Sequence, residues 1–160
     1  MPDPLPVRVV GLLRDLGLSL ATAESLTGGL LGATLTSVPG ASAVFRGGIV
    51  AYATDLKERL LGVAGDVLRE EGAVSRPTAL AMAAGVRDAT GADWALATTG
   101  VAGPDPQEGH PPGTVWLAVA GPQGSAARRC SFTGDREAIR DQSVAAALEL
   151  LEEHLRGFAG

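Results

Sequence analysis

The chain has 160 residues, 46% hydrophobic and 19% charged, and its 13 basic and 18 acidic side chains give a formal net charge of −5. This length suits one domain with a buried core, and the hydrophobic share excludes a disordered acidic tail. The pI of about 5.0 gives no electrostatic footprint for nucleic acid, and no segment has the pattern of a signal peptide or a membrane span. We therefore expect a single cytoplasmic domain over residues 1–160, without nucleic-acid or membrane partners.

Hydrophobic periodicity and turn residues predict helices that alternate with strands along the chain. Ser75 has the character of a helix N-cap, with Pro77 in the first turn. Such an order, with a late antiparallel pair of strands, is typical of an α/β protein: a three-layer α/β/α domain with a mixed, mostly parallel sheet. The expected elements are a helix over 7–16, a strand over 18–25, a helix over 29–38, a strand over 45–52, a helical turn over 56–61, a helix over 76–90, strands over 92–100, 113–121 and 125–134, and a helix over 135–155.

The sequence lacks the motifs of several common classes of binding and catalytic site. There is no GxxxxGK[ST] loop, no GxGxxG after a predicted strand and no GxSxG elbow, which argues against the usual ATP, dinucleotide and serine-hydrolase sites. His110 and His154 have no neighbours at metal-ligand spacing, so we expect no metal. The single cysteine, Cys130, forms neither an internal disulfide nor a structural zinc site.

Two turns rich in glycine and hydroxyl groups follow predicted strands, over residues 23–29 and 98–104. Unpaired N–H groups at a helix start attract anions, and ligands of α/β sheets gather at the carboxyl ends of strands. Caps and tight turns use the same residue types, so each turn alone has a purely structural interpretation. Two such turns in one small domain indicate a small ligand that carries a phosphate.

Ser42, Tyr52 and Lys57 form a candidate nucleophile system that needs no histidine or metal. Lys57 is the one lysine among 13 basic residues, and Tyr52 is the only tyrosine. A serine attacks an amide when a base takes its proton, and a lysine serves as that base once its pKa falls to about 7–8. Tyr52 would relay the proton or orient Lys57. Ser42 could instead cap the turn after Gly40, so spacing alone does not select it.

The order of motifs along the chain resembles the CinA C-terminal domain family of nicotinamide mononucleotide deamidases. The resemblance rests on ATAESLTGGLL (21–31), VPGASAVFRGGIVAYATDLKERLLGV (38–63), GAVS (72–75), TTGVAGPD (98–105), GTVWLAV (113–119) and FTGDREAIR (132–140). It implies hydrolysis of the carboxamide of nicotinamide mononucleotide to nicotinate mononucleotide and ammonia, within pyridine nucleotide recycling. It also implies an α/β/α fold, a pyridine mononucleotide as partner, no cofactor and a homodimer.

Matching these motifs residue by residue assigns catalysis to Ser42, Tyr52 and Lys57. Ser25 remains an alternative nucleophile to Ser42. Arg136 and Arg140 are spaced by one helical turn, so either one could hold the phosphate. The positions that the resemblance places in the substrate pocket are Ser25, Thr27, Gly28, Gly29, Thr99, Gly100, Gly103, Arg136 and Arg140.

The chain departs from the family pattern at two places. Leu26 replaces the usual cysteine of ESCTGG, which excludes a cysteine nucleophile there. Residues 105–112 replace a glycine- and serine-rich stretch, are about one residue shorter, and lack its lysine. The altered stretch leaves an alternative function open, in which the chain is a regulatory module that binds a pyridine nucleotide without turnover. The historical naming of the family suggests a further alternative, a module associated with competence or DNA damage.

Overall fold

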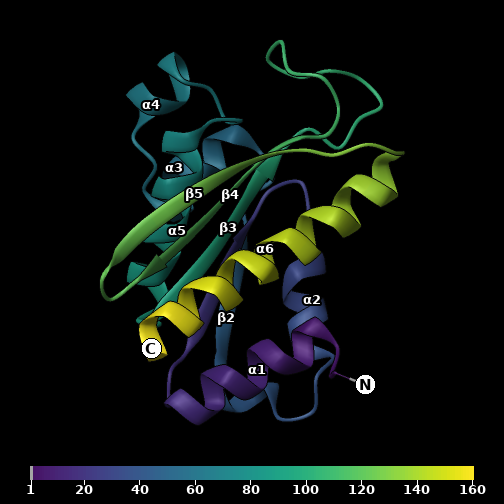
Figure 1. Cartoon of the computed structure of the whole chain (residues 1–160). Coiled ribbons are helices and arrows are strands. Elements are labelled where there is room, and N and C mark those ends of the chain that lie inside the picture. Colours follow the sequence, from purple (N-terminus) through teal and green to yellow (C-terminus); the bar gives the residue numbers. More distant parts are fainter. Residues whose placement is uncertain (1) are drawn as a thin grey trace.

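A five-stranded sheet forms the centre of the computed structural model, which describes residues 2–160 (Figure 1). The strand order is β2-β1-β3-β4-β5; β1 pairs in parallel with β2 and β3, whereas β4 runs antiparallel to β3 and β5. The sheet is therefore mixed, with β4 alone opposed to the common direction. The strands are β1 (Leu20–Glu24), β2 (Phe45–Val50), β3 (Trp94–Gly100), β4 (Thr114–Gly121) and β5 (Gly124–Ser131).

Helices cover both faces of the sheet, which confirms the expected three-layer α/β/α architecture. One face carries α1, α2 and α6, and the other carries α3, α4 and α5 (Figure 1). A short 3₁₀ helix, η1, precedes β2. The helices are α1 (Leu5–Leu16), α2 (Leu30–Thr36), η1 (Ala41–Ala43), α3 (Thr54–Leu61), α4 (Gly65–Glu70), α5 (Arg76–Thr90) and α6 (Arg136–Ala159).

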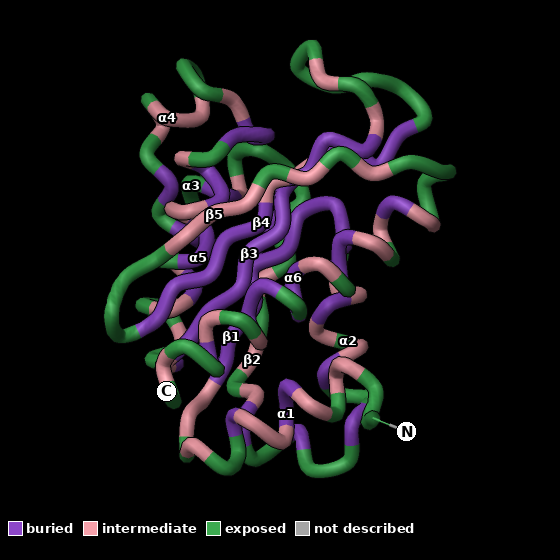
Figure 2. The backbone as a smooth tube through the Cα atoms, in the orientation of Figure 1, coloured by how far each residue is buried: buried purple, intermediate pink, exposed green. Residues whose placement is uncertain are grey.

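The two faces of the sheet bury side chains of different size. Leu96 of β3 belongs to a core of large aliphatic residues under α1, α2 and α6, whereas Ala95 and Ala97 face a core of small residues under α5. Small residues let helices approach closely: a Cβ on Gly85 of α5 would collide with the carbonyl of Leu61 at the end of α3. This close packing fixes the position of α3 against α5. The central strands of the sheet are buried along their length (Figure 2).

Most predicted elements occur where the sequence places them. The Ser75 cap is confirmed, because its hydroxyl accepts a hydrogen bond from the Thr78 amide at 3.3 Å. Helix α6 continues four residues beyond the predicted end, to Ala159, and α4 was not predicted at all. Helix α4 has six residues and buries none of them, so the sequence carries no apolar stripe to reveal it.

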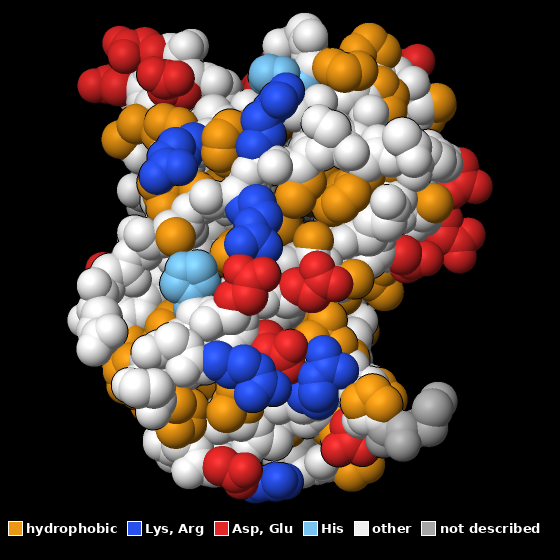
Figure 3. Space-filling view, in the orientation of Figure 1, with side chains coloured by type: hydrophobic (Ala, Val, Ile, Leu, Met, Phe, Trp, Pro, Cys, Tyr) orange, Lys and Arg blue, Asp and Glu red, His pale blue; other side chains and the backbone are white. Residues whose placement is uncertain are grey.

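On the face covered by α6, basic and acidic side chains lie next to one another (Figure 3). Two ion pairs tie α6 to other elements: Arg8 of α1 to Glu152 at 2.9 Å and Arg128 of β5 to Glu153 at 2.7 Å. Among residues 2–160, no helix combines the length and the apolar character needed to cross a membrane.

Candidate active site

The carboxyl ends of β1 and β2 bring together residues that are distant in sequence. These strands pair in parallel with Glu24 opposite Val50, so the segments that follow them leave the sheet side by side. Ser25 comes directly after β1, and Ala51 and Tyr52 come directly after β2. Helix α3 then turns the chain back, which places Lys57 behind Ser25.

The amino group of Lys57 is enclosed by neutral oxygen atoms. Its Nζ donates hydrogen bonds to Ser25 Oγ at 2.9 Å, to the carbonyl of Ala51 at 2.8 Å and to the carbonyl of Tyr52 at 3.3 Å. Lys57 is 1% exposed, and within residues 2–160 no carboxylate forms an ion pair with it. Burial lowers the pKa of Lys57 to about 8, and the charge of Glu108 opposes that shift. A fraction of the molecules at neutral pH therefore holds a neutral lysine against a serine hydroxyl.

A polar cavity of about 400 Å³ opens on Ser25, the less buried residue of this pair, and Lys57 lies outside its walls. Its walls are Ser25, Leu26, Tyr52, Arg136 and the segment 101–107. Arg136 spans the cavity, donating from Nη1 to the carbonyl of Gly103 at 2.6 Å and from Nη2 to the hydroxyl of Tyr52 at 3.0 Å. The volume lies within the range of small-molecule sites, and the guanidinium supplies a positive charge in its wall.

The structure does not bring Ser42 to Lys57, so their expected pairing is wrong. Ser42 is exposed in η1, before β2 begins, whereas Lys57 lies beyond the other end of that strand. Six residues of strand, roughly 17 Å, separate the two ends. Ser42 lines a different cavity, over residues 36–45, whose walls contain no lysine, histidine or carboxylate. Ser25 occupies the place beside the lysine that we had expected Ser42 to fill.

Of the two roles expected for Tyr52, its contacts agree with orienting Lys57 and not with a proton relay. Its carbonyl accepts a hydrogen bond from the Lys57 amino group, while its side chain is exposed and its hydroxyl accepts a hydrogen bond from Arg136. Because Lys57 contacts Ser25 directly, no phenol is needed between them.

The start of α2, after the turn over residues 23–29, does not offer an empty anion site. Glu24, 2% exposed, accepts hydrogen bonds from the amides of Gly29 at 3.1 Å, Leu31 at 2.9 Å and Gly32 at 3.0 Å. The carboxylate thus occupies the start of α2, where we expected a ligand phosphate. In the sequence, an acidic residue that ends an apolar strand just before a glycine-rich turn is the signal that would have predicted a carboxylate at the start of this helix.

The remaining expected pocket residues hold the site's framework together. Arg140 donates to the carbonyls of Leu26 at 3.0 Å and Thr27 at 2.9 Å, and it does not line the Ser25 cavity. The hydroxyls of Thr27 and Thr98 share a buried hydrogen bond of 2.8 Å. Of the two candidate arginines, only Arg136 reaches the cavity. Gly103 is part of its walls, whereas five other expected pocket residues are not: Thr27, Gly28, Gly29, Thr99 and Gly100.

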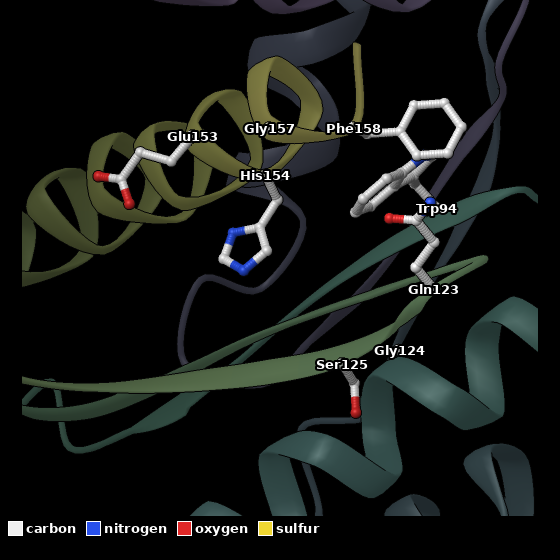
Figure 4. Close-up of a pocket in the computed structure, with 8 residues that line it drawn as sticks. All are labelled: Trp94, Gln123, Gly124, Ser125, Glu153, His154, Gly157 and Phe158. Atoms are coloured by element: carbon white, nitrogen blue, oxygen red, sulfur yellow. The ribbon is translucent and has the colours of Figure 1, made fainter. Parts of the chain in front are cut away.

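A second cavity of about 400 Å³ lies at the opposite end of the sheet, between the β4–β5 turn and the end of α6 (Figure 4). Trp94 and Phe158 meet edge to face there, with ring centroids 5.8 Å apart. The His154 ring bonds to the carbonyl of Leu150 at 2.9 Å, and in Figure 4 the hydroxyl of Ser125 points away from it. This cavity contains no serine paired with a base. Over residues 2–160, no cluster of three His, Cys, Asp or Glu side chains is arranged to hold a metal ion.

Comparisons with known proteins agree with the resemblance in the sequence. Residues 3–155 match the family described as CinA C-terminal domain. A CinA-like protein from Frankia casuarinae is 55% identical over 155 residues, which are 97% of this chain and 36% of the relative, so the chain spans little more than a third of that protein.

A crystal structure of a competence-damaged protein (CinA) superfamily member from Klebsiella pneumoniae is 38% identical, with a TM-score of 0.93 over 96% of both chains. A competence/damage inducible protein from Agrobacterium tumefaciens is 40% identical, with a TM-score of 0.91 over 95% of this chain and 93% of its own. The chain belongs to the CinA C-terminal domain family.

Proposed function

We propose that this chain is an amidohydrolase that converts nicotinamide mononucleotide to nicotinate mononucleotide and ammonia, with Ser25 as nucleophile and Lys57 as base. The observation that carries the proposal is the 2.9 Å hydrogen bond between Lys57 Nζ and Ser25 Oγ at the wall of a polar cavity. A buried lysine with a lowered pKa beside a serine is the arrangement of Ser-Lys hydrolases, which need no histidine.

In the first half-reaction, neutral Lys57 takes the proton of Ser25 while Oγ attacks the carboxamide carbon. The C=O electron pair moves to the oxygen, giving a tetrahedral anion. When the C–N bond breaks, Lys57 returns the proton to the leaving nitrogen, and ammonia departs. The product on the protein is a nicotinoyl ester of Ser25, and Lys57 is again neutral.

Backbone amides next to the nucleophile are available for the tetrahedral anion. The N–H groups of Leu26 and Thr27 make no hydrogen bond within the described residues, and Leu26 lines the cavity. The side chain of Leu26 packs in the hydrophobic core. An oxyanion donor of this kind contributes about 3–4 kcal/mol to the stability of the transition state.

In the second half-reaction, water attacks the ester carbon while Lys57 accepts its proton. Collapse of the new tetrahedral anion breaks the C–Oγ bond, and Lys57 gives the proton to Ser25. The released carboxylic acid ionises in solution. The cycle consumes one water and leaves both residues in their starting forms.

The cavity walls suit the two charged parts of the substrate. Arg136 keeps N–H groups beyond its two hydrogen bonds, and these would bind the phosphate. The exposed ring of Tyr52 presents a face on which the cationic pyridinium would stack.

Ammonia release from nicotinamide mononucleotide tests the proposal, with Ser25→Ala and Ser42→Ala as a matched pair. Both variants lose one serine hydroxyl, yet only Ser25 contacts Lys57. We expect Ser25→Ala to lose activity by at least about a thousandfold and Ser42→Ala to retain it. The reverse result would reject Ser25 as the nucleophile. Calorimetric binding of the nucleotide by a wild-type protein that releases no ammonia would favour the binding module instead.

A further inference from the structure

The loop between β3 and β4, residues 101–113, supplies one whole side of the Ser25 cavity through its segment 101–107. In Figure 1 this loop projects from the end of the sheet near the start of α6. Beyond the cavity the loop turns back in a two-residue hairpin, in which Gln107 and His110 exchange backbone hydrogen bonds of 3.0 and 2.8 Å. The two residues at its tip are Glu108 and Gly109.

Glu108 crosses to a different part of the fold. Its carboxylate accepts hydrogen bonds from the amides of Ala73 at 2.9 Å and Val74 at 3.0 Å, in the segment between α4 and α5. These are the side-chain contacts by which the hairpin tip is fixed to another element. They join positions 34 and 35 apart in the sequence, so no local pattern could have predicted them.

The two amides are held in place by residues outside the loop. The hydroxyl of Thr99 in β3 donates to the carbonyl of Ala73 at 2.7 Å, and Thr78 in α5 donates to the carbonyl of Gly72 at 2.7 Å. Gly72 has a φ of +84°, and a Cβ there would lie 2.7 Å from a Glu108 carboxylate oxygen. The receiving segment is thus ordered by the sheet and α5, and it is shaped to admit a carboxylate.

Glu108 itself has a φ of +53°, and it is the one residue other than glycine with a positive φ among residues 2–160. Most L residues avoid this left-handed region. A turn sequence alone would favour asparagine or glycine at this position. The presence of a glutamate is explained by the two amides that its side chain reaches.

We propose that Glu108 is a positioning residue, which anchors the β3–β4 loop to the Ala73 and Val74 amides and thereby holds segment 101–107 in the geometry that binds substrate. The inference rests on the proposed function, because that segment is the wall of the proposed nucleotide site. Without the anchor, the loop keeps its two ends and the hydrogen bond from Arg136 to the Gly103 carbonyl, but residues 104–107 of the wall lose the contact that fixes the hairpin tip beyond them.

The charge of Glu108 has a second effect that a purely structural contact would lack. Lys57 is faced by Ser25 and by the carbonyls of Ala51 and Tyr52, and Glu108 is the charged group whose field reaches it. This field raises the pKa of Lys57 against the effect of burial. Loss of the charge therefore lowers that pKa, and the acid limb of the rate profile moves to lower pH.

Amide exchange followed by NMR tests the anchor without any turnover. The variants are Glu108→Ala, Glu108→Gln and, as a matched control, Glu71→Gln, which removes an exposed carboxylate beside Gly72. We expect the Ala73 and Val74 amides to exchange about tenfold or more faster in Glu108→Ala and at the wild-type rate in Glu71→Gln. Unchanged exchange in Glu108→Ala overturns the anchor. If Glu108→Ala does not fold, the exchange rates of Glu108→Gln test the anchor instead. The glutamine keeps one carbonyl oxygen as acceptor for one of the two amides, so the other amide should exchange faster.

Steady-state kinetics with nicotinamide mononucleotide then test the positioning role. Glu108→Ala should raise KM about tenfold while kcat changes less than about threefold, and Glu108→Gln should move the acid limb to lower pH. An unchanged KM in a protein whose anchor has been released contradicts positioning, and an unmoved acid limb in Glu108→Gln contradicts the effect of its charge on Lys57. A wild-type protein that neither binds nor hydrolyses the nucleotide would reject the proposed function, whereas the exchange experiment would still decide on the anchor.

Discussion

Lys57 and Ser25 stand 32 positions apart in the sequence and are joined by a buried hydrogen bond of 2.9 Å. Neither residue would be reactive alone. The serine lacks a base without the lysine, and the lysine would stay charged at neutral pH if it were exposed to water. The pairing of β1 with β2 is what makes the two residues a unit.

The rate of amide hydrolysis should follow the titration of Lys57. Because the neutral amine is the base and its pKa is about 8, kcat/KM should fall about tenfold for each pH unit below that value and level off above it. Measurement of kcat/KM from pH 6 to 10 checks this. Lys57→Arg keeps a cation that does not titrate in this range, so it should be inactive at every pH. A pH-independent wild-type rate would show that Lys57 is not the base.

Lys57 should also destabilise the fold in a pH-dependent way. Its pKa falls from 10.5 in the unfolded chain to about 8 in the native state, which corresponds to about 3 kcal/mol of unfolding free energy. Below pH 8 both states bind the proton, and the full cost of the buried charge applies. Between pH 8 and 10.5 the unfolded state binds more protons, so the stability contributed by Lys57 rises with pH.

Urea unfolding of wild type and Lys57→Met across this pH window measures that cost. The stability of wild type relative to Lys57→Met should increase by about 3 kcal/mol from pH 8 to 10.5, since other groups titrate alike in both proteins. A constant difference would mean that the pKa of Lys57 is not lowered.

Glu24 should be a major contributor to stability. Its carboxylate accepts from three amides at the start of α2, of which that of Leu31 is buried and the other two are half-buried, and Glu24→Ala would leave them without this acceptor. We expect Glu24→Ala to lower the unfolding free energy by about 3 kcal/mol in urea unfolding. Glu24→Gln should lose less, because its side-chain oxygen still accepts. The control Glu137→Gln, an exposed acidic residue in the first turn of α6, should change stability by less than about 0.5 kcal/mol.

Replacing Arg136 by glutamine should have a different effect from replacing Arg140 by glutamine. Arg136→Gln removes the cation from the cavity, so the KM for nicotinamide mononucleotide should rise about tenfold or more, and the preference over the riboside without phosphate should disappear. Arg140→Gln removes two hydrogen bonds to the turn after Ser25, so its first effect should be a lower Tm. Kinetics on both substrates and thermal unfolding of both variants separate these roles. A retained phosphate preference in Arg136→Gln would place the phosphate elsewhere.

The layers of the fold were predictable because local patterns encode them: the helices and strands follow apolar periodicity, and the alternation of elements implies three layers. The site was predictable only in part. Lys57, Tyr52 and the Ser25 turn are each conspicuous in the sequence, and they do meet. Ser42 was misplaced because residues close in sequence on either side of a strand are separated by its length, and β2 carries Ser42 and Lys57 to opposite ends of the sheet.

Glu108 and the amides it binds were beyond prediction for a related reason. The contact depends on where the β3–β4 loop folds back, and that is decided by packing between segments more than thirty positions apart. Burial of Lys57 likewise depends on the packing of α3 against α5, and the hydrophobic periodicity of the sequence does not predict which helices pack together.

Because strand β2 lies at an edge of the sheet, it forms strand–strand hydrogen bonds on one side only. Its residues alternate between half-buried and exposed. It delivers the carbonyls of Ala51 and Tyr52, which hold the lysine in place. Fraying of this edge strand would separate the reactive pair while β1, β3, β4 and β5 stay assembled. The chemistry is thus coupled to one of the two edge strands of the sheet, and mild heat or denaturant should abolish activity before the core unfolds.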